Sequence, residues 1–329
     1  MQNRPYLSVL VPVYNEEESI APLAEEIHGA LSGLGKSYEV VLVDDGSRDG
    51  TFPEIKKAVA RYPSFCALRL ATNFGQTAAL AAAIRQARGS VIACLDADLQ
   101  NDPKDIPALL AKLDEGYDVV SGWRKDRKDP WLTRRLPSEA ANWIISCVTG
   151  VPLHDYGCTL KVYRSEFIKE LRLYGEMHRF IPAFTGFLGA RIAEMPVNHR
   201  PRAHGSSKYG LTRIVKVVLD LITVKFMDAY LSKPIYLFGG GGFALGFLGA
   251  VLAAFTLYNR LAHGVFVKDQ PLFQVSIFFA IVGFQLIMLG LIAEILIRVY
   301  YDIKDKPSYF IRERLNIPDA ETVEPATRN

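Results

Sequence analysis

The sequence is poor in the features that mark several common protein classes. Its four cysteines, Cys66, Cys94, Cys147 and Cys158, are widely spaced and form no C-x-x-C pair. Neither a disulfide framework nor a cysteine zinc site is therefore predicted, and a reducing compartment is indicated. The net charge of +3 and the lack of any Lys/Arg-rich block exclude nucleic acid as an expected partner. No G-x-G-x-x-G follows the first apolar run, and no Walker A lysine is present, which argues against dinucleotide-binding and P-loop domains.

The N-terminus also lacks the pattern of a signal peptide. The apolar run at residues 6–13 is too short for the hydrophobic part of such a peptide, and Asn15 and three glutamates follow it at once. We therefore expect the first part of the chain to stay in the cytoplasm.

Charged residues are missing from two long segments near the C-terminus. Residues 235–258 and 272–293 contain no Asp, Glu, Lys or Arg. As a helix the first would rise about 36 Å, enough to cross a hydrocarbon core of roughly 30 Å. We predict two transmembrane helices at about 235–258 and 272–297, within a membrane region at 234–300. Basic residues flank this region, and the positive-inside bias then places both termini in the cytoplasm; they are Lys216, Lys225, Lys233, Arg298, Lys304, Lys306, Arg312 and Arg314.

The stretch before the first span carries an apolar stripe at helical spacing, from Leu211 through Val218 to Ile222. This pattern predicts an amphipathic helix in the membrane interface at 211–233, although an ordinary core helix would show it too. The domains expected are then a cytoplasmic domain at 1–210, this helix, the two spans and a cytoplasmic tail at 301–329. Gly242 and Gly246 form a G-x-x-x-G motif, which predicts close packing of the first span with the second span or with another subunit.

The N-terminal domain alternates between two periodicities. Nearly continuous apolar runs at 7–13, 38–43, 66–70 and 91–96 are typical of buried strands, and helical patterns at 18–33, 51–61 and 75–87 separate them. This alternation predicts an α/β fold with a doubly wound, mostly parallel sheet. Polar clusters follow three of the strands, at residues 14–16, 44–45 and 96–98, and ligands bind at the carboxyl ends of strands in such sheets.

The last of these clusters is suited to a metal ion. Asp96, Asp98 and Gln100 are two residues apart along the chain, so that their oxygens could turn toward one point as the strand ends. Oxygen ligands favour Mg²⁺ or Mn²⁺, and a nucleotide diphosphate needs such a cation when negative charge develops on its β-phosphate. A solvated acidic turn is the alternative explanation.

Four short motifs together resemble family 2 of the glycosyltransferases, which have the GT-A fold. They lie at residues 11–16, 43–47, 73–76 and 95–100. Residues 155–158, residues 202–208 and the paired apolar segments narrow the resemblance to the polyprenyl-phosphate branch. That branch includes dolichyl-phosphate mannose synthases and, as the nearest resemblance, undecaprenyl-phosphate 4-deoxy-4-formamido-L-arabinose transferases. The resemblance covers about residues 5–312.

The resemblance implies roles for the residues at the strand ends. Pro12, Tyr14 and Glu16 would line the nucleotide pocket, and Asp45, alone or with Asp44, would contact the base or ribose. A carboxylate can accept hydrogen bonds from both, whereas it would repel a diphosphate without a metal. A turn in which Asp44 or Asp45 caps nearby amides is compatible with this role for at least one of them.

A lipid phosphate acceptor requires cations, and the resemblance implies five residues for it: Arg124, Arg134, Ser138, Arg202 and Lys208. Arg134 and Ser138 are four residues apart and would share one face of a helix. Ordinary contacts of basic residues with anionic headgroups are the alternative. A general base is not required, because a phosphate monoester is largely dianionic at neutral pH. Asp155 would orient a substrate or shape a turn, and the histidines have no assigned role.

The resemblance as a whole implies an inverting, metal-dependent glycosyltransferase of the inner membrane. It would move a sugar from a nucleotide diphosphate sugar, with UDP favoured, to undecaprenyl or another polyprenyl phosphate. A GDP-mannose-dependent mannose synthase is the alternative enzyme, and a lipid-sugar transporter or membrane scaffold is the alternative outside enzymes. Related enzymes include tetramers, so a homo-oligomer is expected.

Overall fold

The computed structural model describes residues 4–125, 136–173, 175, 177–201, 235–302 and 309–317. The chain divides into two compact units. One comprises residues 1–221 together with 307–329, and the other comprises residues 222–306. The predicted interfacial helix at 211–233 lies outside the described residues.

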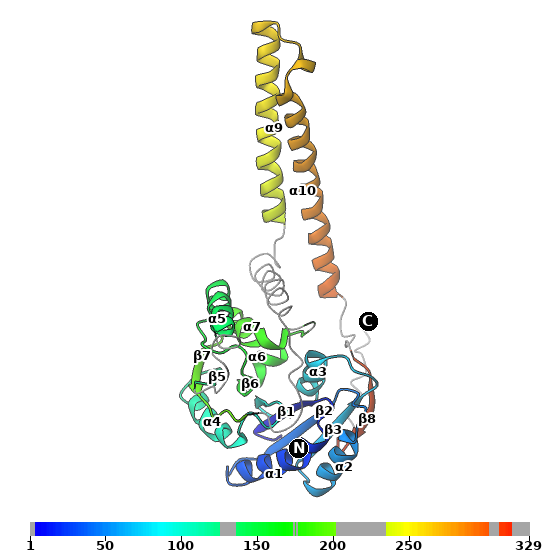
Figure 1. The fold of residues 1–329 in the computed structure, drawn as a ribbon, viewed down its shortest axis with the longest axis vertical. Helices are drawn as coiled ribbons and strands as arrows, with labels where there is room; N and C mark the ends of the chain where they lie inside the picture. Colours follow the sequence, from blue (N-terminus) through cyan, green and yellow to red (C-terminus); the bar gives the residue numbers. More distant parts are fainter. Residues whose placement is uncertain are drawn as a thin grey trace, which may run out of the picture. The chain divides into compact units, whose positions relative to one another are not determined.

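The first unit is built on an eight-stranded mixed sheet with the order β7-β5-β6-β4-β1-β2-β3-β8 (Figure 1). β1, β2, β3 and β4 pair in parallel, as do β5 and β7, whereas β6 and β8 run antiparallel to their neighbours. The prediction of a mostly parallel α/β sheet is therefore confirmed. The strands are β1 (Leu7–Val13), β2 (Tyr38–Asp44), β3 (Phe65–Leu70), β4 (Val91–Cys94), β5 (Val119–Trp123), β6 (Lys161–Arg164), β7 (Ile192–Pro196) and β8 (Ile311–Leu315).

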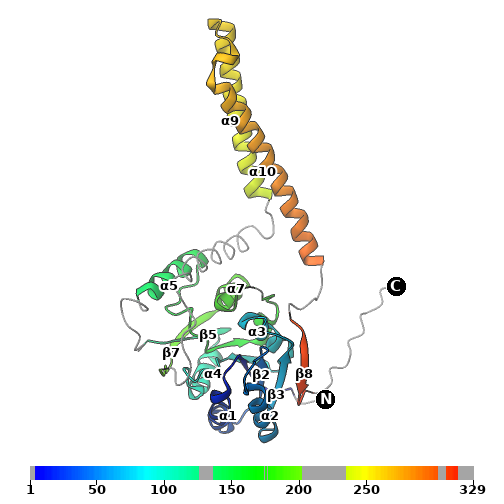
Figure 2. The ribbon, with the colours of Figure 1, turned by 45° about the vertical axis from the view of Figure 1, so that its right-hand side comes forward.

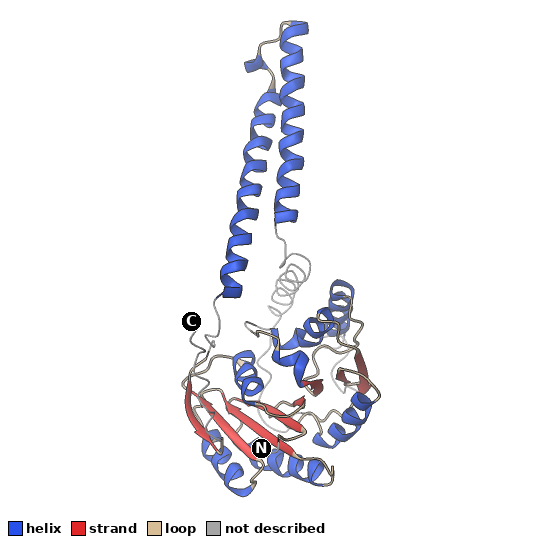
Figure 3. Ribbon diagram, turned by 180° about the vertical axis from the view of Figure 1, so that it is seen from behind, coloured by secondary structure: helices blue, strands red, loops and turns tan. Residues whose placement is uncertain are grey.

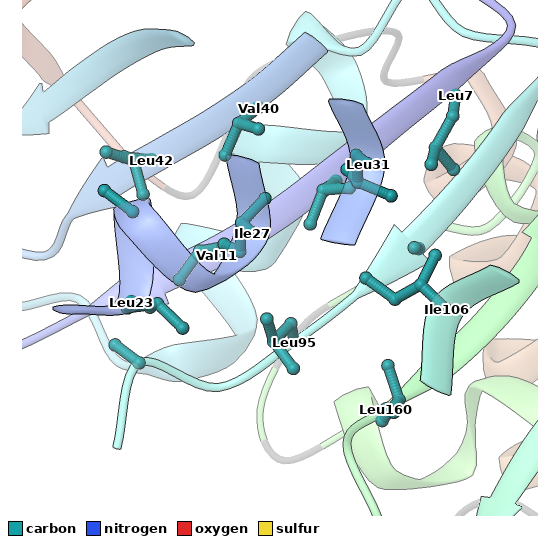
Figure 4. Packing of buried hydrophobic residues seen from close by; sticks show 14 of the residues in the cluster. Leu7, Val11, Leu23, Ile27, Leu31, Val40, Leu42, Leu95, Ile106 and Leu160 are labelled. Atoms are coloured by element: carbon teal, nitrogen blue, oxygen red, sulfur yellow. The ribbon is translucent and has the colours of Figure 1, made fainter. Parts of the chain in front are cut away.

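One face of the sheet is covered by α1 (Glu17–Ser32), α2 (Thr51–Arg61) and α4 (Ile106–Asp114). The apolar residues of α1 recur at helical spacing, so Leu23, Ile27 and Leu31 all point to the sheet (Figure 4). There they pack in one cluster with alternate residues of the strands, such as Val11 and Val40, which are fully buried.

The opposite face is covered by α3 (Gln76–Gln86), which contacts β1 and β2, and by α6 (Ser165–Lys169), which packs between α3 and α7 (Ile181–Phe187). Figure 3 shows the strands with helices on both sides. Because both faces are covered, β1 to β4 are mostly apolar and almost entirely buried. Within the described part of this unit, the remaining helices are η1 (Pro103–Asp105), α5 (Leu136–Thr149) and η3 (Met177–Phe180).

The edge strand β8 was not predicted. It follows the two apolar helices in the chain, yet it pairs antiparallel with β3 and forms one edge of the sheet (Figure 2). Asn316 fixes its end, because Nδ2 donates to the carbonyl oxygens of Pro63 at 3.0 Å and Phe65 at 2.7 Å. The C-terminal segment expected as a tail therefore contributes a strand to the N-terminal domain.

The second unit contains the two long apolar helices α9 (Ile235–His263) and α10 (Pro271–Asp302), joined through η4 (Val267–Asp269). Tyr236–His263 and Pro271–Leu296 are long and apolar enough to cross a membrane. The helices pack closely at glycines: a Cβ on Gly242 would lie 2.5 Å from the carbonyl oxygen of Gly283. The partner of the predicted G-x-x-x-G motif is thus the second helix: a Cβ on Gly283 would lie 2.7 Å from the carbonyl oxygen of Gly242 and 3.0 Å from the amide nitrogen of Gly246.

Candidate active site

The acidic motif lies directly after β4, in a loop that the sheet holds at its start. The strand ends at Cys94, two residues earlier than predicted, but the amide of Leu95 still donates to the carbonyl oxygen of Leu10 at 3.0 Å. Leu99 has a φ of 61°, a left-handed conformation that costs a leucine about 1–3 kcal/mol. This turn lets the amide of Gln100 donate to Asp98 Oδ1 at 3.2 Å. The loop is therefore bent back on itself at the predicted metal ligands.

Asp96 is held by a side chain from another part of the fold. Gln76, at the start of α3, donates from Nε2 to Asp96 Oδ1 at 2.8 Å. The side chain of Thr159 lies near enough to favour the ionised form of the Asp96 carboxyl, which lowers its pKa. Burial raises the pKa of Asp96 to about 6, and the charge of Asp98 adds to the rise, whereas Thr159, Arg124 and Lys161 oppose it. Two carboxylates thus lie close together at a site where burial already disfavours negative charge.

The donor set fits a hard divalent cation only with help from a ligand. Among the described residues no group of three or more His, Cys, Asp or Glu side chains is placed to hold a metal ion. Asp96 and Asp98 can supply carboxylate oxygens, and Gln100 an amide oxygen. Mg²⁺ is commonly bound by one or two carboxylates together with substrate phosphates. A cation here would also relieve the repulsion between the two aspartates.

Asp44 and Asp45 both shape loops. Asp44 is fully buried, accepts the amide of Ser47 at 2.9 Å, and pairs with Arg69 Nε at 3.3 Å. Asp45 accepts the amides of Phe74 at 2.8 Å and Gly75 at 2.9 Å, one on each oxygen. Burial raises the pKa of Asp45, although these amides oppose the rise. The capping turn is therefore present, and a contact of Asp45 with a base or ribose stays a prediction.

The loop after β1 is linked to the loop after β2. The amide of Asn15 donates to Ser47 Oγ at 2.9 Å, and the amide of Glu16 donates to Thr51 Oγ1 at 2.9 Å. Pro12, Tyr14 and Glu16 are half-buried beside this junction. The structure thus brings the predicted nucleotide residues of two neighbouring strands together at the carboxyl ends of those strands.

Arg124 follows β5 and is bound by Asp155. Arg124 Nε donates to Asp155 Oδ2 at 2.7 Å, and Nη2 donates to Oδ1 at 2.9 Å. Burial alone would lower the pKa of Arg124, but Asp155 raises it by more. Glu194 in turn accepts the amides of His154 at 3.0 Å and Asp155 at 2.9 Å. Asp155 therefore binds Arg124, a predicted acceptor cation. The sequence did not reveal this contact.

Residues 155–159, called here the 155–159 segment, connect the two sets of charges. Its first residue, Asp155, binds Arg124. Its last, Thr159, accepts from Asn101 Nδ2 at 2.9 Å and lies near enough to Asp96 to lower the pKa of that carboxyl. The motif at 155–158 was noticed in the sequence, but the role of Thr159 was missed because no pattern marks a single threonine after it.

The remaining acceptor residues are only partly within the described chain. Arg134, Arg202 and Lys208 lie outside it. Ser138 lies in the first turn of α5 and is half-buried. Further along α5, Trp143 is 69% exposed and Ile144 is 40% exposed. This exposed apolar face was not predicted, since the sequence pattern alone does not show which side of a helix meets the core.

Arg200 was also missed, although it anchors the chain just before Arg202. Its amide donates to the carbonyl oxygen of Gln100 at 2.8 Å. Its guanidinium binds Glu26 at 2.8 Å and Asp102 at 2.5 Å. The point at which the chain continues toward residues 202–208 is therefore fixed next to the acidic loop.

Comparisons with known proteins identify the family of this chain. Residues 8–187 match Glycosyl transferase family 2. The chain is 43% identical over 313 residues to the dodecaprenyl-phosphate galacturonate synthase of Rhizobium johnstonii, covering 93% of this chain and 92% of that protein. It is 38% identical over 320 residues to the undecaprenyl-phosphate 4-deoxy-4-formamido-L-arabinose transferase of Edwardsiella ictaluri, covering 96% and 97%.

A solved structure shares the fold. Glucosyl-3-phosphoglycerate synthase from Mycobacterium tuberculosis, in complex with Mn²⁺, UDP and phosphoglyceric acid, superimposes with a TM-score of 0.54 at 17% identity. The match covers 68% of this chain and 78% of that one.

Proposed function

The chain belongs to glycosyl transferase family 2, and on that basis we propose that it transfers a sugar from a nucleotide diphosphate sugar to a polyprenyl phosphate. The observation that carries the proposal is the 155–159 segment, which joins a carboxylate pair to a buried guanidinium. Asp96 lies near Thr159 at one end of this segment, and Arg124 binds Asp155 at the other end. One charge set suits a metal-bound diphosphate, and the other suits a second phosphate.

The donor half of the site is formed by the ends of β1, β2 and β4. Asp96, Asp98 and Gln100 would hold Mg²⁺ or Mn²⁺, and the loops at Tyr14 and Asp45 would enclose the nucleotide. A bound cation would offset the negative charge that develops on the β-phosphate as its bond to the sugar breaks. UDP is the favoured nucleotide, since the resemblance to the formamidoarabinose transferases points to it.

The acceptor half is formed by Arg124, Ser138 and the sequence-predicted Arg134, Arg202 and Lys208. An oxygen of the lipid phosphate would attack the anomeric carbon while the bond from that carbon to the nucleotide diphosphate breaks, which inverts the configuration. The phosphate is largely dianionic at neutral pH, so no side chain has to remove a proton. The protein would then promote the reaction mainly by aligning the lipid phosphate with the anomeric carbon and by neutralising negative charge.

A membrane location accounts for the lipid acceptor. α9 and α10 have the length and composition of spans, and the basic residues that flank them favour cytoplasmic termini. The exposed Trp143 and Ile144 of α5 suit a lipid interface, where tryptophan is enriched. A homo-oligomer remains our expectation from related enzymes.

The transfer can be tested directly in membranes. Vesicles containing the protein and polyprenyl phosphate receive labelled UDP-galacturonate, UDP-linked 4-deoxy-4-formamido-L-arabinose or GDP-mannose. We expect label to enter the lipid fraction from a UDP-sugar, only with Mg²⁺ or Mn²⁺. Asp98→Ala should abolish the transfer while the protein still inserts into the membrane. Transfer without a divalent cation would exclude the metal assignment, and transfer from GDP-mannose alone would favour a mannose synthase.

A scaffold or a lipid-sugar transporter predicts a different outcome. Neither function requires a carboxylate pair at a strand end, and neither would convert the nucleotide sugar. Vesicles that move or retain lipid-linked sugar but release no nucleotide diphosphate would support those alternatives.

A further inference from the structure

Lys161 is a buried lysine to which no role has been given above. It is 3% exposed and lies at the start of β6, between Cys94 of β4 and Ser121 of β5. Its neighbours Leu160 and Val162 belong to the hydrophobic cluster on the α1 side of the sheet. Because side chains alternate along a strand, Lys161 points to the other face. Lysine is almost never fully buried without a partner, since burial disfavours its charge.

The partners of Lys161 are two carbonyl groups of the 155–159 segment. Its Nζ donates to the carbonyl oxygen of Tyr156 at 3.2 Å and, by a shorter contact, to that of Cys158. These carbonyls lie between Asp155, which binds Arg124, and Thr159, which lies near Asp96. The side chain of Lys161 therefore binds the middle of the 155–159 segment. The two ends of this segment adjoin Arg124 and Asp96.

The charges around Lys161 also link it to both Arg124 and Asp96. Asp155 and Arg124 lie close enough to Lys161 to influence its protonation, and Lys161 favours the ionised form of Asp96. Burial itself lowers the pKa of Lys161. The hydrogen bonds to two neutral carbonyls do not depend on a full charge, because an ammonium and an amine both have N–H donors.

We propose that Lys161 is a positioning residue for the transfer reaction: by holding the carbonyls of Tyr156 and Cys158, it fixes Arg124 relative to the metal-binding carboxylates. The proposal rests on the function proposed above. It extends that function, because it makes the acceptor cation and the metal ligands depend on one buried contact. Loss of the contact should loosen both ends of the segment, whereas loss of Asp155 or Thr159 should loosen one end.

The test compares Lys161→Met with a matched control. Methionine keeps the length of the side chain but removes its N–H donors. The control is Lys169→Met, because Lys169 on α6 makes a similar bond, from Nζ to the carbonyl oxygen of Ala87 at 2.6 Å. Three quantities are measured for each protein in the same vesicles: the KM for polyprenyl phosphate, the Mn²⁺ concentration that gives half-maximal activity, and Mn²⁺ binding by electron paramagnetic resonance without substrate.

We expect Lys161→Met to raise the KM for polyprenyl phosphate and to weaken Mn²⁺ binding, each by about tenfold, as for other residues that orient metal ligands. Lys169→Met should change neither. The proposal is overturned if Lys161→Met lowers only kcat, or if the control variant shows the same changes. Weaker Mn²⁺ binding in the spectroscopic assay does not depend on turnover, so failure of the wild type to transfer sugar would count against the proposed function alone.

A second variant covers the case in which Lys161→Met does not fold. Lys161→Gln is shorter but keeps a neutral donor, and it should shift the KM and the Mn²⁺ binding in the same direction by a smaller factor. Unchanged values in a folded Lys161→Gln protein would overturn the proposal. So would the failure of both variants to fold, because that result would assign Lys161 to folding.

Discussion

Arg124 and Asp155 form a two-bonded ion pair, with Nε to Oδ2 at 2.7 Å and Nη2 to Oδ1 at 2.9 Å. The side chain of Arg124 is only 12% exposed and that of Asp155 only 4% exposed. Asp155 therefore orients Arg124 and balances its charge where water has little access. Removing one partner of such a buried pair costs about 3–5 kcal/mol, because the other charge is left uncompensated.

Replacing Asp155 by asparagine should therefore impair the acceptor half of the site. We expect the KM for polyprenyl phosphate to rise about tenfold or more, with a loss of about 3 kcal/mol in the free energy of unfolding. Kinetics at saturating nucleotide sugar would measure the first and denaturant unfolding the second. Asp118→Asn is the control, because Asp118 pairs with Arg191 at 3.4 Å and with Arg164 at 3.6 Å. An equal rise in KM in the control would contradict a specific role for Asp155.

Replacing Gln76 by leucine should impair the metal half. The change removes the donor to Asp96 Oδ1 and leaves the side-chain volume nearly unchanged. Residues that orient metal ligands typically contribute 10- to 100-fold to affinity, so we expect Mn²⁺ binding to weaken by about tenfold. Titration calorimetry would measure it. The matched change on the last residue of α3, Gln86→Leu, should leave Mn²⁺ binding as it is; a similar loss there would indicate a general effect on the helix.

The ionisation of Asp96 should make stability depend on pH. Its pKa is raised by burial to about 6 in the folded chain, above the usual value of 3.8. The stability linked to this group is thus present below about pH 4 and is lost as the pH rises through 6. Asp96→Asn should then stabilise the metal-free protein at pH 7.5 by at most about 2–3 kcal/mol, and the gain should vanish near pH 4. Thermal unfolding at both pH values with a chelator would show this, and a gain of the same size at both would argue against it.

Adding a methyl group at Gly242, but not at Gly240, should disrupt the packing of α9 on α10. A Cβ at Gly242 would lie 2.5 Å from the carbonyl oxygen of Gly283, whereas a Cβ at Gly240 has nothing within 4 Å. Gly242→Ala should lower the midpoint of thermal unfolding in detergent by several degrees, since the two backbones must move apart. Gly240→Ala should not lower it. Equal effects of the two substitutions would mean that the helices do not pack through Gly242.

The sequence was sufficient for the parts of the fold that depend on local pattern. The runs that became β1 and β2 are mostly apolar because both faces of the sheet are covered, and this signal is visible in the residues themselves. The limits of β4 and the edge strand β8 were not predicted. β4 ends at Cys94 although the run continues to Leu95, and β8 alternates apolar and charged residues, as many surface segments do.

The residues of the candidate site also fall into two groups: those that a local sequence pattern predicts and those that only the fold brings together. Asp96 and Asp98 were found because they stand in a motif, and so was the turn of Asp44 and Asp45. Gln76 and Thr159 lie 20 and 63 positions from Asp96 in the chain. Only the packing of α3 on β1 and β2 and the pairing of β6 with β4 bring them near it. Lys161 was overlooked because a lysine in a strand usually faces solvent, and its burial depends on the strands on both sides.

The central claim is that the protein joins a sugar to a polyprenyl phosphate through a single phosphate. The most direct measurement is mass spectrometry of the lipid fraction after incubation with polyprenyl phosphate, Mn²⁺ and each candidate UDP-sugar. We predict a new lipid whose mass is that of the polyprenyl phosphate plus one sugar minus one water, together with an equal amount of UDP. A lipid that also gains a second phosphate, or release of free sugar and UDP with no new lipid, would contradict the account.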